Sequence, residues 1–154
     1  MKIEDEIQSS FKSDYHKLVV NLHFTFLCLT ENFQCLLKQH DLTSTQFNVL
    51  RILRGQKQEP ASIGLIKERM IERNSDVSRV IDRLIKKDVI DRKENKLDRR
   101  QRDIIINQKG LDLLEIIDES EANFVQSIKH VSEDEIKLMN DLLDKIRSNP
   151  NTDV

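Results

Sequence analysis

Residues 74–109 read NSDVSRVIDRLIKKDVIDRKENKLDRRQRDIIINQK, and this stretch decides the fold. Apolar residues recur every three or four positions from 75 to 87, which predicts an amphipathic helix. After Asp88 the period drops to about two, so residues 89–92 and 103–106 are predicted strands joined by a charged connection. A helix followed directly by a basic hairpin is the layout of a winged helix.

Two helices are predicted immediately before this stretch. Thr43 is a good N-cap, and Gln46 lies three residues on, as in a capping box. A further helix begins at Ser62 and runs to about Ile71. The turn at residues 72–74 joins it to the helix at 75–87. Two helices joined by so short a turn form a helix-turn-helix.

The ends of the chain predict long helices. Residues 3 to about 39 form one helix with apolar residues on two faces, and residues 107–129 and 132–147 form two more. A helix with two apolar faces lies either between its own domain and a second subunit or at the centre of a monomeric bundle. The first alternative gives a homodimer. Its interface residues are Phe11, Tyr15, Ile136, Met139, Leu143 and Ile146.

The predicted fold class is mainly α with a small β-hairpin wing, a winged helix-turn-helix flanked by long dimerisation helices. Only 3 Gly and 2 Pro leave little material for turns, which favours this helical architecture. The predicted domains are an N-terminal dimerisation helix (1–40), a winged helix-turn-helix (41–109), C-terminal dimerisation helices (110–147) and a disordered tail (148–154).

The charge distribution indicates a nucleic-acid partner despite a net charge of −2. Residues 74–109 hold eleven Lys/Arg and seven Asp/Glu, a balance of +4, so the rest of the chain carries −6. A basic segment on an acidic body suits binding of double-stranded DNA, with the acidic surface held away from the phosphates. The rival interpretation is a winged-helix protein-interaction module without DNA readout.

Other classes of protein find no support in the sequence. It contains no glycine-rich phosphate loop, no GxSxG and no close pairing of cysteine with histidine, so we expect no enzyme and no catalytic residues. No HxxxH or CxxC spacing predicts a metal, and we expect no cofactor. No apolar run approaches the roughly 18 residues that span a bilayer, and MKIEDEIQSS does not resemble a signal peptide. We therefore expect a cytoplasmic protein with no membrane partner.

Three motifs carry a family resemblance. Leu42-Thr43-x-x-Gln46-x-x-Val49-Leu50, Ser75-Asp76-Val77-Ser78-Arg79-x-x-Asp82-Arg83-Leu84 and Asp98-Arg99-Arg100 occur in this order. In this the chain resembles the winged-helix transcriptional regulators of the MarR family. The resemblance implies a homodimer on a pseudo-palindromic operator, commonly a repressor. It also implies release from DNA through a small, often aromatic, ligand or an oxidant.

The resemblance also implies the DNA contacts. Asp98 and Arg100 match the family's wing signature, and an arginine there would enter the minor groove. We expect Arg83 either to contact DNA or to pair with Asp82 or Glu94. We expect Asp76 either to accept from a cytosine amino group or to stabilise the helix start by its charge. The predicted contact residues are Ser75, Asp76, Ser78, Arg79, Arg83, Lys96, Asp98, Arg99 and Arg100.

A ligand pocket is expected between the first helix, the second helix and the base of the winged domain, near His16, His23 and Phe47. Cys28 and Cys35 lie about 10 Å apart along the first helix, so they cannot form a disulfide within one chain. We expect them to be buried as small hydrophobic residues, and a redox role is the alternative. The family usually has Gly after the recognition helix, so Asp88 is expected to adopt a positive φ.

Overall fold

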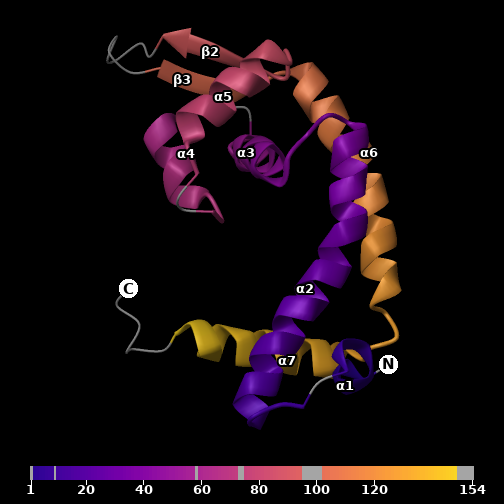
Figure 1. The fold of residues 1–154 in the computed structure, drawn as a ribbon. Helices are drawn as coiled ribbons and strands as arrows, with labels where there is room; N and C mark the ends of the chain where they lie inside the picture. Colours follow the sequence, from indigo (N-terminus) through magenta and orange to yellow (C-terminus); the bar gives the residue numbers. More distant parts are fainter. Residues whose placement is uncertain (1, 9, 58, 73–74, 95–101, 149–154) are drawn as a thin grey trace. The chain divides into compact units, whose positions relative to one another are not determined.

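The structure is a computed structural model that describes residues 2–8, 10–57, 59–72, 75–94 and 102–148. Ten elements follow in order (Figure 1): α1 (Ile3–Ile7), α2 (Asp14–Gln39), α3 (Ser44–Gly55), β1 (Ala61–Ser62), α4 (Ile63–Arg69), α5 (Val77–Lys86), β2 (Ile90–Glu94), β3 (Arg102–Ile106), α6 (Gln108–Ser127) and α7 (Glu133–Arg147). The chain divides into two compact units, residues 1–118 and 119–154, and α6 runs from one into the other. In the described ranges no helix is long and apolar enough to cross a membrane. Residues 149–154 of the tail predicted to be disordered lie outside the described residues.

The N-terminal region is two helices, so the prediction of one helix from residue 3 was wrong. Ser13 is extended (φ −167°, ψ 167°), and its side chain accepts a hydrogen bond from the backbone N–H of His16, which starts α2. A serine competes for backbone donors in this way, which favours a helix start over a helix interior. Lys17 Nζ lies 2.5 Å from Glu4 Oε1, joining α1 to α2. This hydrogen bond holds the pKa of the Glu4 carboxyl below its ordinary value.

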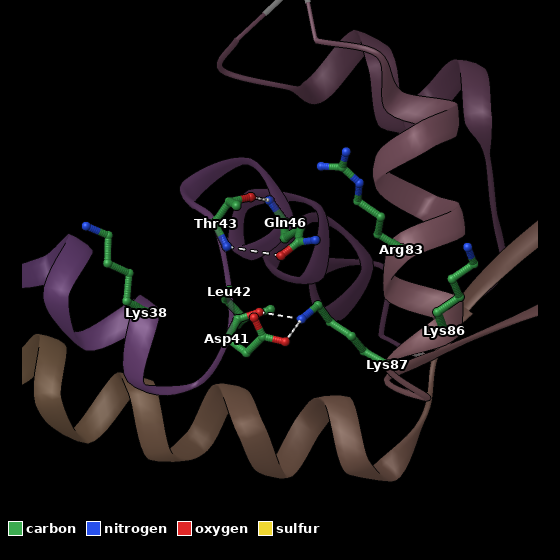
Figure 2. Close-up of a pocket in the computed structure, with 8 residues that line it drawn as sticks. All are labelled: Lys38, Asp41, Leu42, Thr43, Gln46, Arg83, Lys86 and Lys87. Carbon is green, nitrogen blue, oxygen red and sulfur yellow. Dashed lines mark hydrogen bonds and ion pairs between the residues drawn. The ribbon is translucent and has the colours of Figure 1, made fainter.

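The first helix of the winged domain begins as the sequence predicts. Thr43 Oγ1 accepts from the backbone N–H of Gln46 at 3.2 Å, and Gln46 Oε1 accepts from that of Thr43 at 3.0 Å (Figure 2). This is a complete capping box at the start of α3. The side chain of Ser62 likewise accepts from the backbone N–H of Leu65 and starts α4. Both caps confirm the prediction.

The sheet contains the predicted hairpin and one strand more. β2 and β3 pair antiparallel from Ile90↔Ile106 to Glu94↔Arg102, and β1 pairs with the other edge of β3 at Ala61↔Ile104. β1 has only two residues, so no period-two pattern exposed it in the sequence. The predicted fold class is confirmed: a mainly helical chain with a small antiparallel sheet.

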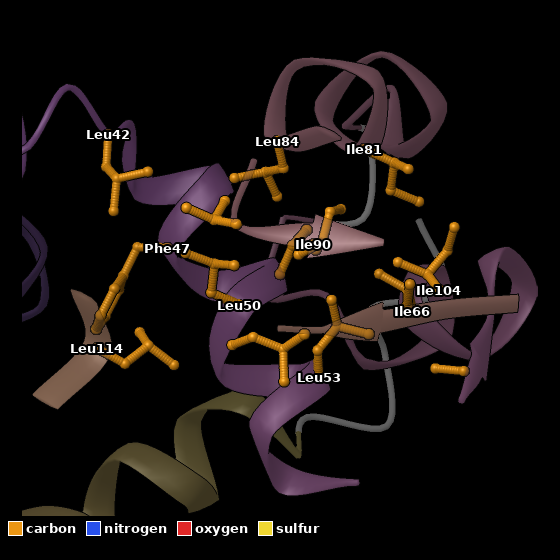
Figure 3. Close-up of a cluster of buried hydrophobic side chains, with 14 of the residues drawn as sticks. Leu42, Phe47, Leu50, Leu53, Ile66, Ile81, Leu84, Ile90, Ile104 and Leu114 are labelled. Atoms are coloured by element: carbon orange, nitrogen blue, oxygen red, sulfur yellow. The ribbon is translucent and has the colours of Figure 1, made fainter. Parts of the chain in front are cut away.

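One hydrophobic core unites the helices and the sheet of the winged domain (Figure 3). The side chains with no more than 1% exposure come from α2 to α6 and all three strands, and they include Leu37, Leu50, Leu53, Ala61, Ile66, Ile81, Leu84, Ile90, Ile104 and Leu114. Complete burial of one such side chain contributes about 1.5–3 kcal/mol. α5 is therefore held by its apolar side against α3 and the sheet.

The junction after α5 is compact. Asp88 has φ 59°, which confirms the predicted left-handed position, and Val89 N–H donates to Leu84 O at 3.3 Å. Asn107 caps α6, since its Oδ1 accepts from Gly110 N–H at 3.1 Å. A Cβ on Gly110 would lie 2.2 Å from Val89 O, so the close approach of α6 to this turn requires glycine.

Candidate nucleic-acid interface

α5 begins two residues later than the sequence predicts, at Val77 instead of Ser75. Asp76 is its N-cap, and Asp76 Oδ1 accepts from the backbone N–H of Arg79 at 3.2 Å. Ser75 lies before the cap. The prediction that both residues belong to the first turns of the helix was therefore wrong, because the Asp76 carboxylate binds a free N–H at the helix start instead. Of the two roles considered for Asp76, the structure shows the stabilising one.

The turn into α5 is tied to α3 by a carboxylate that sequence reasoning missed. Glu72 Oε2 accepts from Ser75 Oγ and from Thr45 Oγ1, each at 3.0 Å. Asn48 Oδ1 accepts from the backbone N–H of Ile71 at 3.1 Å. Thr45 lies 27 positions before Glu72 and Asn48 lies 23 positions before Ile71, so no local motif signals the contacts that tie the turn to α3. This cluster of contacts fixes the direction in which the chain enters α5.

α5 has one buried and one exposed face. Val77, Ile81 and Leu84 are buried in the core. The opposite face carries Ser78, Arg79, Asp82, Arg83 and Lys86, all exposed. The Arg79 side chain is 79% exposed, and its Nε lies 3.9 Å from Asp76 Oδ2, so it is held only by a long, solvated contact. A helix can read base edges when its buried face is packed against the core and its exposed face carries hydrogen-bond donors. α5 meets both conditions.

The two acids considered as partners for Arg83 are paired with other arginines. Asp82 Oδ1 lies 2.7 Å from Arg92 NH2, and Glu94 Oε1 lies 3.0 Å from Arg102 NH1. The first pair joins α5 to β2, and the second joins β2 to β3. The first pair therefore holds the hairpin against α5, the second holds its two strands together, and within the described ranges Arg83 pairs with neither acid.

The predicted wing contacts, Lys96, Asp98, Arg99 and Arg100, lie outside the described residues and remain predictions.

The residues predicted to line a ligand pocket occupy different surroundings. Phe47 is 5% exposed, and its ring meets that of Phe33 edge to face at 5.2 Å between centroids. His16 and His23 are exposed on α2. His16 is 17 positions before Phe33, roughly 25 Å along the helix axis. No described contact brings the three together, and the ligand site remains a prediction.

Cys28 and Cys35 are exposed, so the prediction that they are buried was wrong. Both lie on the second apolar face of α2, where Leu27 is also exposed and Val20 and Phe24 are half-buried. An apolar stripe in a sequence indicates a surface to be covered, but not whether the same chain covers it.

The residues predicted for the dimer interface are incompletely covered. Tyr15 is 85% exposed, Met139 54% and Ile146 50%. Phe11, Ile136 and Leu143 are half-buried. α7 has no buried residue at all. Among the described residues, no group of three or more His, Cys, Asp or Glu side chains is placed to hold a metal ion.

Comparison with known proteins agrees with this geometry. The model of the MarR family matches residues 42–101. The HTH-type transcriptional regulator MhqR of Bacillus subtilis (strain 168) is 25% identical over 134 residues, covering 86% of this chain and 91% of that protein.

Two solved structures share the fold. The Staphylococcus aureus MepR–DNA complex has a TM-score of 0.72 at 23% identity, covering 90% of this chain and 98% of that one. Bordetella bronchiseptica BpsR, whose DNA binding is regulated by 6-hydroxynicotinic acid, has a TM-score of 0.70 at 23% identity, covering 85% and 98%. The winged helix of this chain is thus similar to the MarR family, and the fold of the chain is shared with these two solved structures.

Proposed function

We propose that this chain is a DNA-binding transcriptional regulator that acts as a homodimer on a pseudo-palindromic operator. The observation that carries the proposal is the exposed polar and basic face of α5, opposite its buried face. Two copies of α5 would enter successive major grooves about one helical turn apart. MepR, which shares the fold, is known in complex with DNA.

Each predicted contact residue has a role in this proposal. Ser78 and Arg79 reach base edges from the first turn of α5. Arg100 enters the minor groove from the wing, and Asp98 holds the loop in shape. Arg83, one turn after Arg79 on the same face, takes a guanine or a phosphate, and Lys96 and Arg99 contact phosphates. Ser75 and Asp76 stand at the helix start, where Asp76 acts first as a cap.

The dimer would form through residues 1–40 and 110–147, because these segments carry all the large exposed apolar side chains of the described residues except Ile71. We further propose repression as the mode of action, in the cytoplasm, with release from DNA by a small ligand or an oxidant. Regulation of BpsR by 6-hydroxynicotinic acid gives this a precedent on the same fold.

The test is fluorescence anisotropy on the promoter DNA upstream of the gene, beside a random duplex of equal length. Arg79→Ala should relax base preference at one position and cost about 1–3 kcal/mol on the promoter alone. Arg100→Ala should lower the salt slope by roughly one unit. An equal loss on both duplexes would make Arg79 a phosphate contact. Binding to neither duplex at low salt would favour the protein-interaction module.

A further inference from the structure

A charged hollow of about 530 Å³ lies between the end of α2, the start of α3 and the second half of α5 (Figure 2). Figure 2 shows Lys38 on one side of it and Arg83 and Lys86 on the other. The residues that line it are Lys38, Asp41, Leu42, Thr43, Gln46, Arg83, Lys86 and Lys87. Four of these carry a positive charge and one a negative charge.

Asp41 and Lys87 neutralise each other inside the hollow. Lys87 Nζ donates to the Asp41 carboxylate and also to the Asp41 carbonyl oxygen. The polar groups of Thr43 and Gln46 are likewise engaged with each other in the capping box. No acid is therefore left among the lining residues to balance the remaining cations.

Three cations remain, Lys38, Arg83 and Lys86. Each is exposed, and in the described part of the chain none of their side chains makes a hydrogen bond or an ion pair. Three like charges around one hollow repel one another until an anion enters. In a chain with a net charge of −2, such a concentration selects for an anionic partner.

The position of the hollow identifies the anion. Arg83 and Lys86 lie on the exposed face of α5, and Arg83 follows Arg79 by about one helical turn. When a recognition helix lies in the major groove, the phosphates at the edge of that groove pass beside it. Arg79 faces the bases in the proposed complex, and Arg83 and Lys86 follow it along α5 at the edge of the hollow. A backbone phosphate would lie at this edge.

We infer that this hollow binds a phosphate of the operator backbone, with Lys38 contributed from outside the winged helix. The inference rests on the proposed DNA-binding function and deepens it. It assigns Arg83 to a phosphate rather than to a base. It also adds Lys38 and Lys86, which no sequence motif singled out, to the DNA-binding surface. Because Lys38 belongs to α2, a bound phosphate would connect α2, the helix proposed for dimerisation, to the recognition helix α5.

The test compares the salt dependence of promoter binding for the wild type, the double variant Lys38→Met/Lys86→Met and the control Lys12→Met. Lys12 is an exposed lysine that does not line the hollow. Loss of one phosphate contact lowers the slope of log K against log salt by about 0.9 for each bound subunit. Between about 50 and 200 mM salt, the variant should therefore lose about threefold less affinity per subunit than the wild type.

Two further readouts separate a phosphate contact from other roles. The ratio of promoter to random-duplex affinity should stay unchanged in the double variant, because phosphates carry no sequence information. Its unfolding midpoint should match that of the wild type, because both lysines are exposed. The control variant should keep the full salt slope.

The outcomes distinguish the hollow from the proposed function. A wild-type slope retained by the double variant would overturn the inference and leave the DNA-binding proposal intact. Absence of any wild-type binding to duplex DNA would overturn both. A small anion shares the chemistry, so inorganic phosphate is titrated in thermal melts at constant ionic strength. One outcome is that phosphate stabilises only the wild type while the wild type and the double variant show the same salt dependence of promoter binding. In that case the hollow binds a free anion, and the inference is wrong.

Discussion

The winged domain and the terminal helices contain similar apolar residues, yet they use them differently. In the winged domain Leu50, Ile66 and Ile81 have no exposed surface, because α3, α4, α5 and the sheet cover one another. On α2 Tyr15 is 85% exposed, and no residue of α7 is more than half-buried. Contiguous exposed apolar surface marks a face that another molecule covers. The difference teaches that one region buries its apolar side chains within a single chain, while the other leaves them exposed, as the proposed dimer requires.

The largest expected effect is a cavity in the complete region. Leu50→Ala should lower the free energy of unfolding by about 2–5 kcal/mol, because Leu50 is fully buried between α3 and its neighbours. Urea denaturation measures this loss. The loss should be the same at every protein concentration, since the site belongs to one chain. A loss below 1 kcal/mol would show that the core of the winged domain is not tightly packed around Leu50.

Met139→Ala on α7 is the matched change in the other region. Met139 is 54% exposed, so its truncation should change the stability of a single chain little. In a dimer the same change weakens association, and the melting midpoint should then fall more steeply on dilution than for the wild type. Thermal melts over a hundredfold dilution series measure this. A midpoint independent of concentration in both proteins would mean that α7 is not an interface.

Adding one methyl group at Gly110 or at Gly64 tests how tightly the two sites are packed. A Cβ on Gly110 would lie 2.2 Å from the backbone oxygen of Val89, so Gly110→Ala should force the backbone apart and cost about 1–3 kcal/mol. Gly64→Ala is the control, because only Ser62 Oγ lies within 4 Å, at 3.7 Å. It should be neutral or stabilise α4 by about 0.5–1 kcal/mol. Equal effects of the two substitutions in urea denaturation would contradict the tight α5–α6 junction.

The start of α5 offers a smaller effect that separates stability from DNA reading. Asp76→Ala should cost about 0.5–2 kcal/mol through loss of the cap, and Asp76→Ser should restore most of it. If the carboxylate acts only as a cap, Asp76→Ser binds the promoter at least as tightly as the wild type. A stable Asp76→Ser variant with altered base preference would instead show that Asp76 reads DNA directly.

The smallest expected effect is the pH dependence of the α1–α2 contact. The hydrogen bond from Lys17 lowers the pKa of Glu4, so the contact stabilises the fold above the ordinary carboxyl value of 4.5 and is lost as the pH falls through the lowered pKa. The wild type should therefore protect α1 amides from hydrogen exchange better than Glu4→Gln at neutral pH. The two proteins should converge in acid. A difference that persists well below pH 4.5 would exclude this ion pair as its cause.

Local signals predicted most of the winged domain. Thr43, Ser62 and Ser132 start helices as expected, because a cap is a property of a few neighbouring residues. The left-handed Asp88 followed from its place between a helix and a strand. The hairpin followed from a period of two on both sides of a charged loop.

Features that depend on residues far apart in the sequence, or on a second molecule, could not be predicted from local sequence patterns. The Glu72 cluster and the Asp82–Arg92 pair join residues on separate elements, so spacing within one motif does not reveal them. The break at Ser13 was missed because the apolar stripe continues across it. The exposure of Cys28 and Cys35 was missed because periodicity shows an apolar face without showing what covers it.

The most direct test of the central claim is the mass of the complex between this chain and a duplex of its promoter, measured by sedimentation at physiological salt. A DNA-binding dimer predicts two chains of 18.1 kDa on each duplex, and the complex should dissociate as salt rises. Met139→Ala should shift the distribution toward free DNA at low protein concentration. One chain per duplex, or a complex indifferent to salt, would contradict the account.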